Sequence, residues 1–388
     1  MGAVAAVAVV AVLVPSAAFA AEPGYAGWSG GSGAFRMASP AAGFPGAELS
    51  TNGSPVTTPS GTSVWMGEGT PFGAAYGSSR GQGYIGIGTT SGNLPSTTVL
   101  TFDTPTPASK WAFALGDIDV DMVEISGTDA DGNALTGSDL GFQSAFNLCQ
   151  NSPRPGGCKS AATDQPAWDE AARTLTGTNS GDTVGATGWF EPAVAVASLT
   201  FTFADFSGIP MFQLWVAAEA YEVVTAVEPV LVSAPGEPDP GSGPGDVLGR
   251  CSDMAGEVRL ELLDAGGEPV ADENGDPVTA ELGEDGSFRF AKVFPGSYRV
   301  RIVTDEHYPV DGATVQDLEV ADGDVAGPSF SVECVPEPAQ AEPAANDGTD
   351  EDDARPALPV TGPGAGLWIA ALLSLAGGAL AVRTARNH

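Results

Sequence analysis

Histidine and lysine are scarce in this chain of 388 residues. The two histidines are His307 and His388, so neither a Ser-His-Asp nor a Cys-His catalytic arrangement can form in the long region before them. Acidic residues outnumber basic ones by 49 to 15, which gives a formal charge of −34. So negative a surface repels nucleic acid, and we expect no nucleic-acid partner. We also expect no enzymatic activity, although so many carboxylates leave paired-acid glycoside hydrolysis open.

Cysteine is also rare, with four residues in all. Cys149 and Cys158 lie close together, whereas Cys251 and Cys334 bracket a separate segment. An even count with this local spacing predicts the disulfides Cys149–Cys158 and Cys251–Cys334, and hence export to an oxidising compartment. A zinc site is disfavoured because the chain has no C-x-x-C motif and so few histidines.

Long runs with helical periodicity are missing, while glycine (52) and proline (31) are abundant. Apolar and polar residues alternate in 97–103 and 198–203, and 212–216 and 221–224 have the composition of closing strands. Period-2 runs separated by turn signals predict an all-β fold. We therefore expect residues 22–225 to form a large, jelly-roll-like β-sandwich that displays a ligand-binding face.

Two proline-rich stretches divide the second half of the chain. Residues 226–245 contain a run of Pro, Gly and Asp, which predicts a solvated linker. Residues 335–357 combine Pro, Ala and acids, which predicts an extended stalk that reaches roughly 70 Å. The segment between them, 246–334, carries several strand-like runs and predicts a smaller β domain.

Two runs in this smaller domain carry a family resemblance. Residues 286–290 read GSFRF, and Phe294-Pro295-Gly296 opens the run FPGSYRV. Together they resemble the G-x-F-x-F…PG-x-Y-x-V pattern of prealbumin-like sandwiches, a group that includes carboxypeptidase regulatory-like domains and the Cna-B/SpaA repeats of surface adhesins. The resemblance implies a second, smaller β-sandwich. Many Cna-B/SpaA domains also carry a Lys–Asn isopeptide bond, but Lys292 and Asn274 are the only such residues here and neither is on a terminal strand, so we predict none.

The last 31 residues carry a second resemblance. A pentapeptide is followed by the uncharged run 364–382 and then by Arg383 and Arg386. This order matches the L-P-x-T-G sorting signal of Gram-positive surface proteins, here Leu358, Pro359, Val360, Thr361 and Gly362. The resemblance implies that sortase cuts after the threonine and joins its carboxyl to a peptidoglycan precursor.

The physical properties of the tail suit that task. About 20 apolar residues span a bilayer and cationic residues prefer the cytoplasmic side. We therefore expect 364–382 to be a transmembrane helix before sorting and 383–388 a cytoplasmic tail. The alternative is a permanent membrane helix beside a chance pentapeptide.

The N-terminus predicts an export signal over residues 1–20. An apolar run ends at Pro15 and is followed by a small-x-small cleavage site at Ala18, Ala20 and Ala21. A positively charged n-region is missing, and we expect the true start to lie upstream.

Three acids end the most regular strand-like run. Large apolar side chains occupy alternate positions from 111 to 115, and the next alternate positions hold Asp117, Asp119 and Asp121. Because unpaired charges do not enter a core, we expect the chain to leave it near Gly116 and the carboxylates to cluster at a rim. Such oxygen ligands suit Ca²⁺, the one candidate cofactor, and the turn 129–133 adds further acids. The alternative is a set of plain solvated acids, with a hairpin turn at Asp131-Gly132.

Two tryptophans are candidate ligand contacts. Trp168, in a stretch (161–175) that we expect to be a loop or short helix, and Trp189 both have polar or glycine-rich neighbours. Exposed indole rings can stack on flat ligands such as sugars. The alternative is that they cap the ends of the sandwich.

Taken together, these features predict a secreted, wall-anchored surface protein that displays an adhesin-like binding module toward a host or environmental glycan or protein. Two alternatives stay open: a structural or minor pilus component of the wall, and a wall-tethered glycosidase.

Overall fold

Short strands dominate the structure, as the missing helical periodicity predicts. The computed structural model describes residues 24–90, 94–179, 183–205, 210–231, 257–272, 274–283, 287–306, 308–321 and 323–334. The predicted export signal, stalk, sorting motif and membrane helix lie outside these ranges, as does Cys251. Within the described ranges, no helix combines the length and apolar character needed to cross a bilayer.

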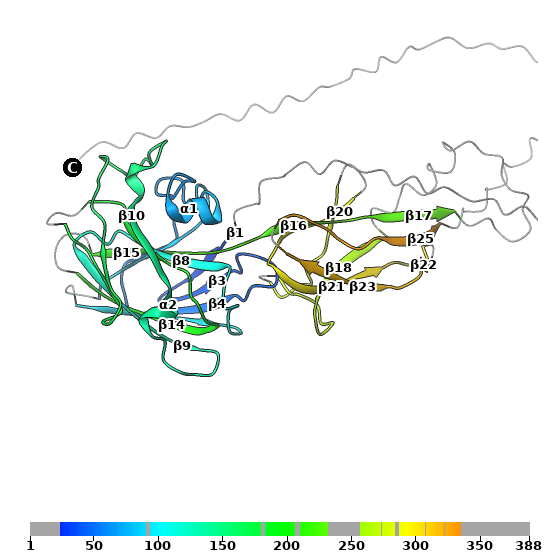
Figure 1. Ribbon diagram of the computed structural model, residues 1–388, viewed down its shortest axis with the longest axis horizontal. Helices are drawn as coiled ribbons and strands as arrows, with labels where there is room; N and C mark the ends of the chain where they lie inside the picture. Colours follow the sequence, from blue (N-terminus) through cyan, green and yellow to red (C-terminus); the bar gives the residue numbers. More distant parts are fainter. Residues whose placement is uncertain are drawn as a thin grey trace, which may run out of the picture. The chain divides into compact units, whose positions relative to one another are not determined.

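The first β-sandwich consists of two antiparallel sheets (Figure 1). In the seven-stranded sheet, the order is β10-β13-β8-β15-β6-β5, and β1 also pairs with β15. Its strands are β1 (Gly24–Tyr25), β5 (Val56–Thr57), β6 (Ile85–Gly88), β8 (Trp111–Gly116), β10 (Phe142–Asn147), β13 (Ala186–Phe190) and β15 (Met211–Ala218). The order in the eight-stranded sheet is β11-β12-β9-β14-β7-β4-β3-β2. Its strands are β2 (Trp28–Gly31), β3 (Ala34–Met37), β4 (Ala47–Thr51), β7 (Ser96–Phe102), β9 (Asp121–Asp129), β11 (Ala167–Asp169), β12 (Thr174–Thr176) and β14 (Val196–Asp205).

The core of this sandwich lies between the two sheets. From β6 to β10, each successive strand joins the opposite sheet, so the chain repeatedly crosses the core. In β7, buried and more exposed residues alternate along the whole strand, and Leu100 pairs with Leu199 of β14 inside the core. The predicted strands 97–103 and 198–203 are therefore confirmed.

A third layer covers the outer face of the seven-stranded sheet. Helix α1 (Pro71–Tyr76), capped by Thr70, lies there with the 3-10 helix η1 (Leu148–Gln150), and together with neighbouring loops they bury a second apolar cluster. Strand β8 is consequently buried on both faces: Phe113 faces the core between the sheets, and Ala114 faces the outer layer. A strand covered on both sides needs no polar face, which explains its nearly continuous apolar sequence.

The second β-sandwich is smaller and has its own core. Its sheets have the orders β19-β20-β16-β24, β17-β25-β22 and β18-β21-β23. The strands are β16 (Tyr221–Thr225), β17 (Val227–Leu231), β18 (Arg259–Asp264), β19 (Glu281–Leu282), β20 (Phe288–Val293), β21 (Gly296–Val303), β22 (Val310–Asp311), β23 (Val315–Val320), β24 (Val325–Ala326) and β25 (Phe330–Cys334). The all-β class and the division into a larger and a smaller β-sandwich are as predicted.

The boundary between the two sandwiches differs from the prediction. The sequence pattern predicts that 221–224 closes the first sandwich and that 226–245 is a linker. Instead, β16 pairs with β20 and β24, and β17 pairs with β25, so both strands belong to the second sandwich. The prediction is wrong because alternation identifies a strand but not the sheet that the strand joins.

Backbone and side-chain contacts join the two sandwiches. The amide of Ala42 donates to the carbonyl of Lys292 at 2.7 Å, and its carbonyl accepts from the amide of Phe294 at 2.9 Å. The ring of Phe294 is 4 % exposed and lies 5.6 Å from the ring of Phe44, centroid to centroid, in the core of the first sandwich. The Phe-Pro-Gly motif thus reaches from one core into the other.

One buried acid of the second sandwich is held by two arginines. Glu261 on β18 is 4 % exposed, and its carboxylate accepts from Arg301 Nε at 2.9 Å and lies 2.7 Å from an Arg259 nitrogen. Burial alone would raise the pKa of Glu261, but the hydrogen bonds and positive charges of both arginines more than offset it, so the pKa is lowered.

We predict that Glu261→Gln costs about 1.5–3 kcal/mol of unfolding free energy at pH 7, the range for hydrogen bonds to charged groups. A lowered pKa means that the folded state binds fewer protons than the unfolded state, so the stabilisation is present above the unfolded pKa of about 4.3 and is lost as pH falls through the folded value. Urea unfolding from pH 7 to pH 3 should show a smaller loss of stability in Glu261→Gln than in the wild type. The exposed Glu281→Gln is the control and should follow the wild type; equal pH slopes in all three proteins would contradict the prediction.

Candidate functional site

The structure places the three predicted calcium ligands at the end of β8, but not at a solvated rim. The strand ends at Gly116, as predicted, and Asp117 turns the chain in the left-handed region with φ 65°. Asp117 is half-buried, whereas Asp119 and Asp121 are only 2 % and 3 % exposed. The expectation that all three carboxylates face solvent is therefore wrong, because the chain re-enters the sandwich at once as β9.

Backbone donors, rather than cations, surround the carboxylate of Asp119. It accepts hydrogen bonds from the amides of Val120, at 2.8 Å, and Thr183. Burial raises the pKa of Asp119, and these amide donors oppose that effect only in part. Among the described residues, no three His, Cys, Asp or Glu side chains gather closely enough to hold a metal ion. Calcium at these carboxylates stays a prediction.

The second acidic segment forms a hairpin turn. The carboxylate of Asp129 accepts from the amides of Asp131 and Asn133 at 2.9 and 2.8 Å, and Gly132 supplies the left-handed residue at φ 83°. The turn at Asp272 has the same pattern of hydrogen bonds. These aspartates thus shape turns, as the alternative interpretation of the acids predicts.

The two candidate ligand-binding tryptophans lie in different parts of the first sandwich. Trp189 is 7 % exposed, packs edge-on against Phe72 at 5.6 Å in the outer layer, and donates from Nε1 to Ser144 at 2.9 Å. Its ring offers no face to a ligand, so that part of the prediction is wrong. Trp168 is half-buried on β11, where a strand stands in place of the expected loop or helix, and stacks on Phe142 at 5.7 Å. Of these two tryptophans, only Trp168 is partly exposed.

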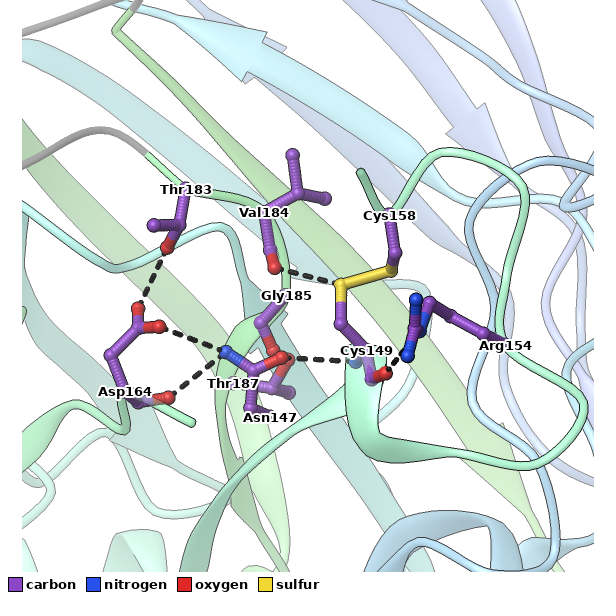
Figure 2. Close-up of a disulfide and its surroundings, with 9 residues drawn as sticks. All are labelled: Asn147, Cys149, Arg154, Cys158, Asp164, Thr183, Val184, Gly185 and Thr187. Carbon is purple, nitrogen blue, oxygen red and sulfur yellow. Dashed lines mark hydrogen bonds between the residues drawn. A yellow bond between two sulfur atoms is a disulfide. The ribbon is translucent and has the colours of Figure 1, made fainter. Parts of the chain in front are cut away.

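The disulfide Cys149–Cys158 forms as predicted, with its Cα atoms 5.5 Å apart (Figure 2). It closes a loop in the layer that covers the seven-stranded sheet. The Cys149 Sγ atom lies 2.9 Å from the carbonyl oxygen of Val184. Gly185 follows in the left-handed region at φ 110°, and a Cβ there would lie 2.8 Å from the same sulfur atom, so only glycine allows this approach.

A polar network joins this loop to the acidic stretch, and Figure 2 shows the part of it from Asn147 to Thr183. Asn147 accepts from the amide of Cys149 at 2.9 Å and donates to the backbone carbonyl of Asp164 at 3.0 Å. The Asp164 carboxylate accepts from the Thr183 hydroxyl at 2.8 Å, and the Thr183 amide donates to Asp119. Sequence reasoning missed Asp164 and Thr183, because partners so far apart in the chain leave no spacing signal.

Two open hollows flank β3 in the described part of the first sandwich. One, of about 430 Å³, is lined mainly by glycines and hydroxyl side chains such as Ser32 and Thr51. The other, of about 410 Å³, includes Arg36 and Glu48. Both hollows are open at the surface, which suits a flat contact with a macromolecule better than enclosure of a small ligand.

Comparisons with known proteins assign no family. A scan of protein-family models finds no match, and a search of curated proteins finds none. Solved structures with some likeness include BcpA, the major pilin subunit of Bacillus cereus (TM-score 0.21, 10 % identity, 63 % of this chain and 65 % of that one). Others are GBS52, the minor pilin of Streptococcus agalactiae (0.21, 13 %, 40 % and 71 %), and the major pilin SpaD of Corynebacterium diphtheriae (0.21, 11 %, 63 % and 64 %). The chain spans slightly less than two thirds of BcpA, and at these TM-scores the likeness carries no assignment.

We predict that replacing Cys149 and Cys158 together by Ala costs about 3 kcal/mol of unfolding free energy, because a closed loop of this length restricts the unfolded chain. Chemical unfolding of both proteins without reductant measures the difference. Lys159→Ala, at the exposed position next to Cys158, is the control and should change the stability by less than about 0.5 kcal/mol. A double variant as stable as Lys159→Ala would contradict the prediction.

Proposed function

We propose that this chain is an exported surface protein, joined covalently to the cell wall through Thr361, which holds two β-sandwiches outside the cell. The observation that carries the proposal is the order at the C-terminus: an L-P-x-T-G pentapeptide, an uncharged run long enough to span a bilayer, and two arginines. The disulfide Cys149–Cys158 adds support, since such bonds persist in oxidising compartments. Sortase and the peptidoglycan precursor are the partners that this proposal requires.

Under this proposal, the first sandwich is the display module. Its candidate contacts are the hollows that flank β3 and the partly exposed ring of Trp168. The hollows are open at the surface and the indole ring is aromatic, which suits contact with a glycan or a protein surface.

A structural or minor pilus component is the second candidate. The observation that favours it is the architecture of the second sandwich, whose first and last strands run parallel, so that the chain enters at one end and leaves at the other. Such a module lengthens the molecule along its own axis. The pilin neighbours belong to the same structural class, although their low TM-scores add no weight.

We predict that wall digests of the native host release a peptidoglycan-linked peptide that ends at Thr361. Thr361→Ala should abolish most of the wall-linked protein, because the L-P-x-T-G pattern specifies threonine at the position where the chain is cut. Val360→Ala, at the variable position of the motif, is the matched control and should keep wild-type attachment. Mass spectrometry of wall and membrane fractions measures both, and intact 364–388 in the mature wild-type protein would refute the proposal.

We further predict that Trp168→Ala lowers binding of the secreted protein to a glycan array. Because the ring also packs on Phe142 and Phe190, the variant should lose stability as well, so binding is compared at a temperature at which both proteins are folded. High-mass ladders in wall extracts blotted for the native protein would instead support the pilus candidate. If Trp168→Ala binds as the wild type does, Trp168 is no ligand contact.

A further inference from the structure

The two ends of the second sandwich run side by side in the same direction. β16 and β17 form its first segment, and β24 and β25 form its last. Figure 1 shows β17 and β25 side by side. β16 pairs in parallel with β24, and β17 pairs in parallel with β25 from Val227 opposite Phe330 to Leu231 opposite Cys334. The other paired strands of the described residues are antiparallel.

Backbone hydrogen bonds run the length of this parallel pair. The amide of Gly327 donates to the carbonyl of Val224 at 2.7 Å, and the amide of Phe330 donates to Ala226 at 3.0 Å. In a parallel ladder, this register places the next β17 donor at residue 228 and turns the nitrogen of residue 229 outward. Residue 229 is a proline on the edge strand of its sheet, where it needs no partner for an amide hydrogen.

The direction of the strands decides how tension acts on these bonds. The chain enters at Tyr221 from the first sandwich and leaves after Cys334 toward the predicted anchor at Thr361. A pull between these ends draws β17 and β25 in opposite directions along their own axes, so the bonds between them are loaded together. Antiparallel ends would instead separate one bond at a time, starting at the loaded end.

We propose that the β16–β17 and β24–β25 pairing is a mechanical clamp, which makes the second sandwich the load-bearing element between the first sandwich and the wall. The clamp's role in the cell rests on the proposed wall attachment, because only a tethered end transmits tension. Its resistance to force is a property of the fold itself.

The first sandwich provides an internal comparison. Its first described residues, Gly24 and Tyr25, pair antiparallel with Ala218 and Ala217 at the end of β15. Tension applied through the chain ends therefore separates β1 from β15 one hydrogen bond at a time. In the second sandwich, the same tension loads the bonds between β17 and β25 together.

The test is single-molecule force spectroscopy on the full chain, tethered at its two ends, in a Cys251→Ser background so that no crosslink to Cys334 limits the extension. The second sandwich releases roughly 400 Å of chain between residues 221 and 334, and the first releases roughly 650 Å between 24 and 218. We expect the longer event at the lower force. The shorter event at equal or lower force would overturn the clamp.

Two matched variants test the bonds themselves. Glu228 has an exposed side chain, and Glu228→Pro removes its amide donor, which faces β25. Glu333→Pro removes an amide donor on the opposite side of β25, where the Glu333 amide donates to the Pro309 carbonyl at 2.7 Å. Both should lower the melting temperature. We expect Glu228→Pro to lower the unfolding force of the shorter event by roughly a fifth to a third, since it removes one of the few bonds loaded together, and Glu333→Pro to leave it near the wild-type value.

Equal effects of the two variants, or no effect of Glu228→Pro, would overturn the proposal. Should either variant fail to fold, the order of the two events in the parent chain still decides. The force measurement is made on purified protein, so a failure of wall attachment leaves its outcome unchanged.

Discussion

The chain passes from one sandwich to the other through two residues, Glu219 and Ala220. Ala220 is buried in the first core, and the amide of Glu219 donates to the carbonyl of Lys110 at 2.9 Å, so the connection is itself packed and hydrogen-bonded. Phe294 adds a second connection from the opposite direction. A junction this short and this closely packed leaves few free residues between the two sandwiches.

Short connections also account for the burial of Asp119 and Asp121 in the first sandwich. β8 is covered on both faces, and the chain stays buried through residues 118–121, where β9 begins. Asp119 and Asp121 are carried into the interior with it, and amide groups take the place of water around Asp119. The pKa of Asp119 is still raised, because these amide donors offset the loss of hydration of its carboxylate only in part. Its partner Thr183 links it to Asp164 and the disulfide loop, which makes the acidic stretch part of the support for the outer layer.

Local patterns were predictable from sequence, and long-range partners were not. Alternation located β7 and β14, and the close spacing of Cys149 and Cys158 identified their bond, because both signals lie within a few residues. The position of Trp189 was misjudged because its glycine-rich neighbours resemble a surface loop, whereas a third layer covers that face. The membership of β16 was misjudged for a related reason: its partners lie about 70 and 100 residues further along the chain.

Because β16 and β17 belong to the second sandwich, an isopeptide bond between its first and last strands would have to join other residues than the sequence pattern suggests. The family resemblance implies a lysine on the first strand and an asparagine on the last, and the sequence pattern placed the first strand at 257–263. The structure shows that the true first segment is β16 and β17 and the last is β24 and β25. Residues 221–231 contain no lysine, and residues 323–334 contain no asparagine. The prediction that no isopeptide bond forms therefore applies equally to the strands that the structure identifies. The link between the first and last segments therefore rests on the parallel hydrogen-bond ladder and on the burial of Val227, Phe330 and Val332 beside it. A ladder of this kind resists tension through the number of bonds loaded at once, whereas an isopeptide would do so through one bond that does not yield.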